Sequence, residues 1–328
     1  MQFYDAIAPE LAMVEKEIER MLAGEPKEIY GMLLPFIKRG GKRIRPALAT
    51  LCCRAVGGKG EDAVFPGALI EMFHNFTLIH DDIEDDSQFR RGEPTLHRQH
   101  GIPIALNSGD ALYTLIWKRF AEADMDCGRF RLLQKLFLSD FKRVVEGQGL
   151  ELDWERGGRF DITEKQYFDM ITRKTAALMG LSCETGAFLG GADDAVRRAL
   201  RKFGEDIGIA FQIQDDVLNV TGEFEKYQKE IGGDITEGKR TLMVVHCLDH
   251  ATPGEKKKAS AILSSHTSRK EDLEYVMELF RKYGSTDYAH RHALRLVEDA
   301  KKQLICLRDS EEKKMLVSLA DFVVKREK

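Results

Sequence analysis

Residues 69–86 read LIEMFHNFTLIHDDIEDD, and the fold prediction depends on this stretch more than on any other. Four of its side chains follow one another at steps of three and four, the spacing along one face of a helix: Ile70, Phe73, Thr77 and His80. Five of the six residues from 81 to 86 are acidic. The pattern predicts a buried helix that ends in a cluster of carboxylates, rather than an acidic helix on the surface.

Helical signals continue along the rest of the chain. Only 8 prolines occur, and none lies between Pro103 and Pro253. A proline inside a helix costs about 3 kcal/mol, so a long stretch without one favours helices. Thr163 and Gln166 form a capping-box pattern, and Pro253 followed by Glu255 is typical of a helix start. No two-residue hairpin turn is expected, because the sequence signals for one are absent.

The breaks between the predicted helices are short. They fall at five glycine pairs: Gly40-Gly41, Gly57-Gly58, Gly157-Gly158, Gly190-Gly191 and Gly232-Gly233. None of these breaks is long or polar enough to be a flexible linker. We therefore expect an all-α fold, with residues 1–328 forming a single domain of about a dozen helices.

Composition excludes several classes of protein. The chain has 328 residues, 43% hydrophobic and 32% charged, and its 50 Lys and Arg against 54 Asp and Glu leave a net charge of −4. No nucleic-acid partner is expected, because nucleic-acid binders usually carry a basic excess. No apolar run reaches the ~18 residues of a membrane span, and residues 1–13 lack the basic start of a secretory signal. The 6 cysteines include no CxxC pair, which argues against a zinc ribbon or disulfide framework and predicts a cytoplasmic protein.

A second acidic cluster, residues 212–219, reads QIQDDVLN and again follows an apolar helical stretch. Asp81 and Asp85 are four residues apart, so their carboxylates lie on one helix face and repel unless a positive charge lies between them. Asp215 and Asn219 have the same spacing. One acidic run alone is usually a solvated surface, but two at the ends of apolar helices indicate a shared metal site. Oxygen-only ligands favour Mg²⁺ or Mn²⁺ over zinc.

The Lys and Arg residues near these motifs indicate that the protein binds a phosphorylated ligand. Mg²⁺ usually takes one or two carboxylates and completes its shell with water and substrate phosphate, which implies a phosphorylated ligand. Lys and Arg supply further phosphate-binding groups: Lys42, Arg43, Arg45, Arg90, Arg91, Lys174, Lys229 and Lys239. Each alone is usually an ordinary surface cation. Together they exceed what one metal-bound diphosphate needs, so the sequence predicts a second phosphate site that uses no metal.

The order of these motifs resembles that of the trans-isoprenyl diphosphate synthases, the family of the farnesyl and geranylgeranyl diphosphate synthases. The resemblance covers roughly residues 30–250. It rests on these motifs: Gly41-Lys42-Arg43-Ile44-Arg45-Pro46, Asp81-Asp82-Ile83-Glu84-Asp85 with Arg90-Arg91-Gly92, Lys174-Thr175, Phe211-Gln212-Ile213-Gln214-Asp215-Asp216, and Gly233-Asp234 with Gly238-Lys239. It implies an all-α isoprenoid-synthase-type bundle around a central cavity, and a homodimer.

The resemblance implies a role for each motif. Asp81, Asp85 and Asp215 would bind three Mg²⁺ ions, for which Mn²⁺ can substitute. The implied catalytic residues are Asp81, Asp82, Asp85, Lys174, Asp215 and Asp216, with Asp82 and Asp216 supporting the metal ligands. The implied contacts of the allylic diphosphate are Arg90, Lys174, Thr175, Gln212, Lys229 and Lys239. The implied contacts of isopentenyl diphosphate are Lys42, Arg45, His74 and Arg91.

The reaction implied by the resemblance is an ionisation, a condensation and an elimination. The allylic diphosphate leaves, the double bond of isopentenyl diphosphate attacks the allylic cation, and a proton is lost. Two positions depart from the family's pattern. Asn219 stands where many members have Asp, and Glu230 lies beside the expected cation Lys229. Activity is expected to be retained, because Asp215 is the expected direct metal ligand.

Product length is expected to depend on the side chains just before the first motif, because a helical turn rises about 5.4 Å, close to one isoprene unit. Thr77 and Phe76 lie four and five residues before Asp81, where the farnesyl synthases of animals have aromatics at both positions. The presence of an aromatic at only one of these two positions resembles the pattern of the archaeal-type geranylgeranyl synthases. Phe73 and Met72 would close the floor deeper down. The expected product is C20, with C15 as the main competitor.

Two other interpretations keep the same fold. A class I terpene cyclase would share the metal chemistry, and Asp215, Asn219 and Glu223 approximate its second motif. A cyclase has no use for the predicted second diphosphate site, which argues against it. A non-catalytic synthase subunit should lack one aspartate motif, and this chain has both.

Three further interpretations are unrelated to prenyl transfer. Glu71 and His74 form an ExxH step, whereas a di-iron helical bundle needs two such steps. His80-Asp81 resembles part of a metal phosphohydrolase site, but the further histidine upstream is not evident. A plain helical scaffold without activity is the simplest alternative, and loss of all turnover in Asp81→Ala with the fold intact would speak against it.

Overall fold

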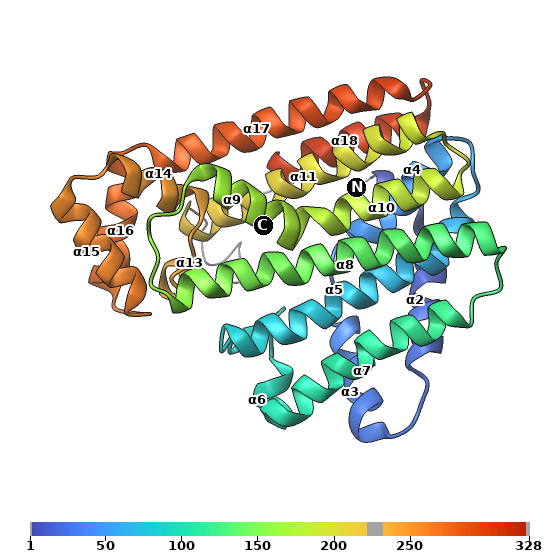
Figure 1. Cartoon of the computed structure of the whole chain (residues 1–328), viewed down its shortest axis with the longest axis horizontal. Coiled ribbons are helices and arrows are strands. Elements are labelled where there is room, and N and C mark those ends of the chain that lie inside the picture. Colours follow the sequence, from blue (N-terminus) through green and yellow to red (C-terminus); the bar gives the residue numbers. More distant parts are fainter. Residues whose placement is uncertain (1, 222–231, 326–328) are drawn as a thin grey trace. The chain divides into compact units, whose positions relative to one another are not determined.

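The computed structural model describes residues 2–221 and 232–325, which are helical almost throughout (Figure 1). The predicted all-α fold is thereby confirmed. Contacts within the chain separate it into two compact units. Unit 1 consists of Met1–Phe141, Leu181–Arg201 and Cys306–Leu316, and unit 2 of Lys142–Gly180, Lys202–Ile305 and Val317–Lys328. That residues 1–328 form a single domain stays a prediction.

Unit 1 is built around the long apolar helix α5 (Val64–Glu84). The elements beside it are α1 (Gln2–Ala6), α2 (Ala8–Leu22), α3 (Lys27–Lys38), α4 (Ile44–Ala55), η1 (Gly60–Ala63), β1 (Phe89–Arg90), β2 (Glu93–Pro94), α6 (Leu96–His100) and α7 (Ile102–Ala121). α5 packs against α2, α4 and α7. Because neighbours surround α5, residues 69–73 are all buried, Glu71 included.

α5 ends in its acidic cluster, as the sequence predicts. The helix stops at Glu84, and the chain turns at Asp86, whose φ is 51°. The N–H of Asp85 donates to the carbonyl oxygen of Asp81 at 2.8 Å, so these two residues lie one turn apart. The C-terminal end of a helix carries a partial negative charge, which adds to that of the carboxylates. The cluster can be stable here only with cations close by.

A short hairpin follows α5, and its presence corrects the expectation from sequence. β1 pairs antiparallel with β2 through the two-residue turn Arg91-Gly92. Both turn residues have positive φ, 55° and 78°, as a type I′ turn requires. Arg rarely adopts this left-handed conformation, so local sequence signals do not reveal the turn. Arg90, just before the turn, is instead held by hydrogen bonds to Asp82.

Unit 2 contains the second acidic cluster. Its elements are α9 (Glu164–Ile171), the π-helical turn η2 (Thr172–Ala176), α13 (Gly233–Thr236), α14 (Leu242–His250), α15 (Pro253–Ser264), α16 (Lys270–Lys282) and α17 (Ser285–Gln303). Five elements contribute residues to both units: α8 (Cys127–Arg156), α10 (Ala177–Leu189), α11 (Asp194–Thr221), η3 (Leu304–Cys306) and α18 (Glu311–Lys325).

The predicted helix starts in unit 2 are confirmed. The Thr163 side chain accepts from the N–H of Gln166, whose own side chain accepts from the backbone of Thr163, which is a complete capping box. Thr252 and Glu255 form a second one, with Pro253 in the first turn of α15. Among residues 2–221 and 232–325, no helix combines the length and the apolarity needed to cross a membrane.

Four rings lie against one another between α14 and α17. The ring centroids of His246 and Tyr288 are 4.0 Å apart, those of Tyr288 and His292 4.6 Å, and those of His246 and His250 4.2 Å. The Tyr288 hydroxyl donates to the carboxylate of Glu164 on α9. Burial, and after it the neighbouring His250, lowers the pKa of His246. Burial lowers the pKa of His292 as well.

These lowered pKa values predict a loss of stability in mild acid. Below the ordinary histidine pKa of about 6.5 the unfolded chain takes up protons that the stacked rings resist, so the free energy of unfolding falls with pH. We expect denaturant unfolding to show a steeper fall between about pH 7.5 and pH 5.5 for the wild type than for a His246→Gln/His292→Gln variant. His100→Gln, at an exposed histidine, should keep the wild-type slope. Equal slopes for the wild type and the double variant would contradict the prediction.

Candidate functional site

Arg90 compensates part of the negative charge of the first acidic cluster. Its Nε donates to Oδ1 of Asp82 at 2.8 Å, and a second hydrogen bond runs from Nη2 to the same oxygen. Burial acts to lower the pKa of Arg90, but the carboxylates of Asp82, Asp81 and Asp85 raise it. One guanidinium from β1 thus lies among three carboxylates from the end of α5. The structure brings these four predicted residues together within unit 1.

Asp82 is the buried member of the cluster, with 1% of its surface exposed. Burial raises its pKa, although Arg90 acts in the opposite direction. Among the residues that the structure describes, its Oδ2 atom has no hydrogen-bond partner. A buried carboxylate oxygen without a partner is costly, so this atom is suited to accept from a ligand or from water around one.

A basic cluster forms a second site in unit 1, where the loop after α3 meets the hairpin. A side chain at Gly41 would place its Cβ 2.9 Å from Nη2 of Arg91 and 3.2 Å from Nη1 of Arg43, so both guanidinium groups lie over the glycine backbone. Burial, and then Arg45 and Arg91, lower the pKa of His74 well below its usual range. The imidazole therefore stays neutral at physiological pH. Three of the predicted contacts for isopentenyl diphosphate, Arg45, His74 and Arg91, are brought together.

Arg45 has free donor capacity in this cluster. Burial lowers its pKa, and its Nε has no hydrogen-bond partner in the described part of the chain. Arg43 differs, since its Nη1 donates to Glu71 at 3.0 Å, its Nη2 to the carbonyl oxygen of Ile37 at 2.9 Å, and its Nε to Glu15. Arg43 is therefore bound within the protein, while Arg45 has a donor available for an anion.

Sequence reasoning missed the role of Glu71, which it weighed only as part of an ExxH metal motif. Glu71 is 2% exposed and pairs with Arg43. The pairing with Arg43 gives the Glu71 carboxylate a cation within the protein, so the di-iron alternative is not needed to explain it. A usable signal was present, because an acid inside an apolar helix requires a cation as partner.

In unit 2 the predicted residues Lys174 and Thr175 lie in the π-helical turn η2. A Cβ at Gly147 would overlap the backbone nitrogen of Lys174, so α8 passes directly against this turn. Such π-helical turns are rare and often occur at functional sites. The Lys174 ammonium group is paired with Glu151, which sequence reasoning did not identify. Burial acts to raise the pKa of Glu151, but Lys174 and then Lys239 lower it.

The second acidic cluster is tied to η2 by hydrogen bonds. Thr175 Oγ1 donates to Oε1 of Gln212 at 3.3 Å, and Gln212 Nε2 donates to Oδ1 of Asp216 at 2.9 Å. Tyr167 donates its hydroxyl to Oδ2 of Asp216 at 3.4 Å, a contact that the sequence did not reveal. Burial, and then the neighbouring Asp234, raise the pKa of Asp216 well above its usual range. Crowded carboxylates of this kind gain stability from a bound cation.

Asn219, the departure in the second motif, has a defined structural role. Its side-chain Oδ1 accepts from the N–H of Asp234 at 3.1 Å, and its backbone oxygen accepts from the N–H of Gly232 at 2.8 Å. It thus fixes the start of α13 and places Asp234 near Asp216. Lys239 lies 3.8 Å from Asp234 and pairs with Glu237. The predicted contact Lys229 and its neighbours Glu223 and Glu230 lie outside the described residues.

The donor groups fit a divalent cation. The predicted ligands are carboxylate oxygens only, as hard cations such as Mg²⁺ prefer. In unit 2 the neighbouring carboxylates of Asp234 and Asp215 both raise the pKa of Asp216, a repulsion that a cation would relieve. In unit 1 the unpartnered Oδ2 of Asp82 lies in the same cluster as Asp81 and Asp85. The roles of Asp81, Asp85 and Asp215 as metal ligands stay predictions.

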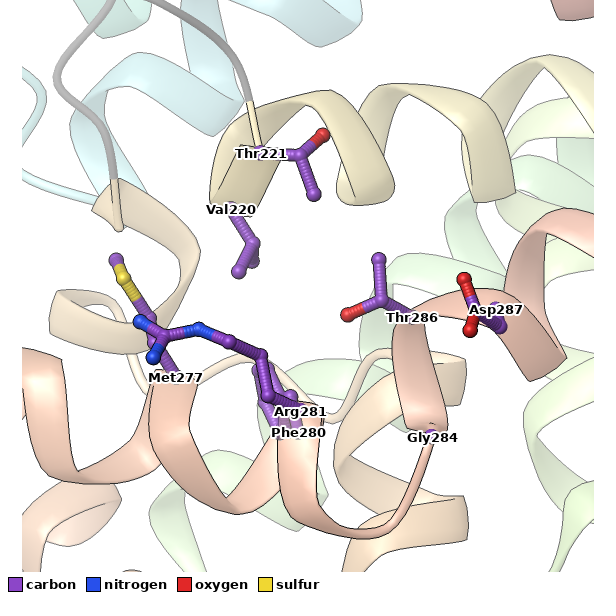
Figure 2. Close-up of a pocket in the computed structure, with 8 residues that line it drawn as sticks. All are labelled: Val220, Thr221, Met277, Phe280, Arg281, Gly284, Thr286 and Asp287. Carbon is purple, nitrogen blue, oxygen red and sulfur yellow. The ribbon is translucent and has the colours of Figure 1, made fainter.

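A cavity of about 350 Å³ lies in unit 2 where α11 ends (Figure 2). It is lined by Val220, Thr221, Met277, Phe280, Arg281, Gly284, Thr286 and Asp287. None of the predicted site residues lines it, although Val220 directly follows Asn219. In Figure 2 the side chain of Val220 extends from α11 toward the side of the cavity that Arg281 and Thr286 line.

Comparison with known proteins decides the family. Residues 26–280 match the sequence model of the polyprenyl synthetases. The chain belongs to the polyprenyl synthetase family. A short chain isoprenyl diphosphate synthase of Methanothermobacter thermautotrophicus is 38% identical, over 100% of this chain and 99% of the relative. A geranylgeranyl diphosphate synthase of Sulfolobus acidocaldarius is 34% identical, over 100% of both chains. This polyprenyl synthetase is therefore a short-chain prenyltransferase.

Solved structures agree with this assignment. The crystal structure of geranylgeranyl pyrophosphate synthetase from Pyrococcus horikoshii matches with a TM-score of 0.93 and 32% identity, over 99% of this chain and 98% of that one. A polyprenyl synthase from Caulobacter crescentus, crystallised with calcium and isoprenyl diphosphate, matches with a TM-score of 0.91 and 27% identity, over 99% and 97%.

Names of other relatives leave the product length open. A geranylfarnesyl diphosphate synthase of Natronomonas pharaonis is 32% identical, and an octaprenyl diphosphate synthase of Escherichia coli 31%, each over 98% of this chain and 97% of the relative.

Aromatic rings lie below the first acidic cluster of this polyprenyl synthetase, where the chain-length residues were predicted. The ring centroid of Phe76 lies 4.6 Å from that of His80 and 5.2 Å from that of Tyr113 on α7. Phe73 is fully buried and stacks on Phe141 at 3.6 Å. Phe76 thus contacts a ring on the neighbouring helix α7, whereas Phe73 belongs to the aromatic core. The partner Tyr113 was missed, because only the tertiary fold brings α7 beside α5.

Asn219 provides a test of the local structure around the second cluster. Asn219→Ala removes the acceptor for the Asp234 N–H, a loss of about 1 kcal/mol, so that amide should exchange with solvent about fivefold faster. Asn219→Asp keeps an acceptor in place and should leave the exchange close to the wild-type rate. Hydrogen exchange followed by mass spectrometry over residues 232–239 measures both variants. Equal exchange in Asn219→Ala and the wild type would contradict this role.

Proposed function

We propose that this polyprenyl synthetase condenses isopentenyl diphosphate with an allylic diphosphate to give a C20 product, geranylgeranyl diphosphate. The basic cluster around Gly41 carries this proposal. Arg45 and Arg91 offer cations to a diphosphate, and Glu71, the carboxylate that raises the pKa of Arg45, is already paired with Arg43. A second diphosphate can therefore bind there without a metal ion, as a condensation of two diphosphates requires.

We propose further that Asp81, Asp85 and Asp215 bind Mg²⁺, three ions in all, with Mn²⁺ able to substitute. Bound Mg²⁺ would stabilise the negative charge that develops on the departing diphosphate. The chain's own residues would do the rest of the binding. Asp82 is held by Arg90, and Asp216 by Gln212 and Tyr167, so both can orient the ligands beside them.

The allylic diphosphate would be bound by cations and polar groups from both motifs. The proposed contacts are Arg90, Lys174, Thr175, Gln212, Lys229 and Lys239. Lys174 is held by Glu151 in the structure, and Thr175 by Gln212, so both are oriented before a substrate binds. Isopentenyl diphosphate would be bound by Lys42, Arg45, His74 and Arg91. A neutral His74 donates one hydrogen bond without adding charge to an already basic site.

Product length is proposed to be set by the aromatic floor before Asp81. Phe76 and Tyr113 form the first layer, and the buried Phe73 lies below them. Thr77 has a small side chain and leaves room beside them. Its hydroxyl donates a hydrogen bond to the carbonyl oxygen of His74 on the same helix. Of the two positions before Asp81, only Phe76 is aromatic and Thr77 is not, which favours the C20 product over the competing C15 product. A class I terpene cyclase remains the less favoured alternative, because it would leave the basic cluster around Gly41 unused.

A homodimer is proposed as the working state. Apolar side chains with 41–53% of their surface exposed follow one another along the start of α7: Ile102, Ile104 and Leu106. Leu138 on α8 is a further exposed apolar side chain, at 49%. Exposed apolar side chains grouped in this way are typical of a surface that another chain covers. A cytoplasmic location stays a prediction.

The metal-ligand proposal predicts a loss of turnover. Asp81→Asn and Asp215→Asn keep the shape but remove the charge, so each should lower kcat at least about 100-fold. Incorporation of labelled isopentenyl diphosphate with each allylic starter and Mg²⁺ measures this and identifies the product. Asp86→Asn is the matched control, because Asp86 pairs with Arg98 at 2.6 Å and has no proposed role. Wild-type turnover in either Asp81→Asn or Asp215→Asn would refute the assignment.

A double variant tests whether the two acidic clusters serve the same ions. If they do, Asp81→Asn/Asp215→Asn should be little worse than the worse single variant, because either loss already disrupts the shared ion set. Losses that multiply would indicate that the clusters act independently.

The floor proposal predicts longer products. Phe76→Ala should shift the product from C20 toward C25 and beyond, because it opens about one isoprene unit of depth. Tyr113→Ala should do the same from the opposite helix. Phe65→Ala serves as the control, since it removes a ring from the same helix three turns earlier. Product chromatography decides, and an unchanged product in both Phe76→Ala and Tyr113→Ala would show that the floor lies elsewhere.

A further inference from the structure

The loop that joins α3 to α4 has an unusual backbone. Gly40, Gly41 and Arg43 all have positive φ, at 106°, 138° and 44°. Arg43 is not a glycine, so its left-handed conformation is strained and persists only where surrounding contacts impose it. The loop carries Lys42 and leads directly into Arg45. Its shape therefore determines where the first cations of the basic cluster lie.

Contacts from several helices hold this loop. The Arg43 side chain is bound by Glu15 on α2, by the carbonyl oxygen of Ile37 on α3 and by Glu71 on α5. These contacts fix the residue at the end of the loop. The hydroxyl of Tyr4, on the N-terminal helix α1, donates to the carbonyl oxygen of Lys42. That hydrogen bond fixes the peptide group just before Arg43, and its donor, Tyr4, is not one of the proposed substrate contacts.

The Lys42 carbonyl lies next to the basic cluster. It belongs to the residue after Gly41, whose backbone lies under the guanidinium group of Arg91. A rotation of the Lys42–Arg43 peptide would move the Gly41 backbone and the Lys42 side chain together. Tyr4 is suited to prevent this, because burial and the nearby Glu71 raise its pKa and keep its hydroxyl a donor.

We infer that Tyr4 is a positioning residue for the metal-free diphosphate site, acting through the Lys42 carbonyl. This inference rests on the proposed function. Tyr4 does not touch the substrate, so its effect is confined to the site whose loop it holds. The allylic site depends on other residues, and its affinity should not change. Through Tyr4, the N-terminal helix α1 thereby contributes to the recognition of isopentenyl diphosphate.

Tyr4→Phe in the full-length enzyme tests the inference. We expect the KM for isopentenyl diphosphate to rise about fivefold, the factor that corresponds to one lost hydrogen bond. The KM for the allylic diphosphate and kcat should stay within about twofold of the wild type. Calorimetric binding of isopentenyl diphosphate in EDTA should weaken by the same factor, because this site uses no metal.

Tyr30→Phe is the matched control, since the Tyr30 hydroxyl makes no hydrogen bond among the residues that the structure describes. It should leave both KM values unchanged. Thermal unfolding of Tyr4→Phe shows that the variant is folded. If both KM values rise together, or if neither changes while the wild type is active, the inference about Tyr4 is wrong. If the wild type itself forms no product from isopentenyl diphosphate, the proposed function fails first, and the inference fails with it.

Discussion

Carboxylates held at the end of a buried helix need cations beside them, and this constraint organises unit 1. α5 is apolar for most of its length and ends in Asp81, Asp82 and Asp85, where the helix adds its own negative charge. Arg90 supplies the nearest compensation through its hydrogen bonds to Asp82. In the turn of the β-hairpin, Arg91 has a strained left-handed backbone conformation. This conformation places Arg90 next to the carboxylates and Arg91 next to the loop at Gly41.

The same constraint has a different solution in unit 2. Asp216 is crowded by Asp234 and buried, so its pKa is raised, and hydrogen bonds from Gln212 and Tyr167 hold it in place. Lys174 and the buried Glu151 form a separate ion pair. In both units a functional charge is matched by a partner that the protein supplies, and part of the binding capacity remains for a ligand. Pre-oriented charges of this kind favour electrostatic stabilisation of a departing diphosphate.

Much of the fold and of the candidate site could be predicted from the sequence, because those features depend on local signals. Scarce prolines, the steps of three and four before Asp81, and the capping box at Thr163 each reflect the energetics of a single helix. The partners were harder to predict. Glu71, Glu151, Tyr167 and Tyr113 act through contacts between residues 23–49 positions apart, or on a neighbouring helix, and no local pattern marks them. The hairpin turn at Arg91 was missed because Arg rarely adopts the left-handed conformation, so no local signal marks the turn.

The sequence by itself determined the helical class, the two carboxylate clusters, the arginine-rich motifs and the membership of the polyprenyl synthetases. These features follow from residue identity and spacing along one chain. Only the tertiary structure decided which cations are bound within the protein and which remain available: Arg43 is held by Glu15 and Glu71, whereas Arg45 keeps an unpartnered donor. It also gave Asn219 a role at the start of α13 and Tyr4 one at the Lys42 carbonyl. The physical reason is that hydrogen bonds and ion pairs depend on distances of a few ångströms in space, and separation along the sequence does not report those distances.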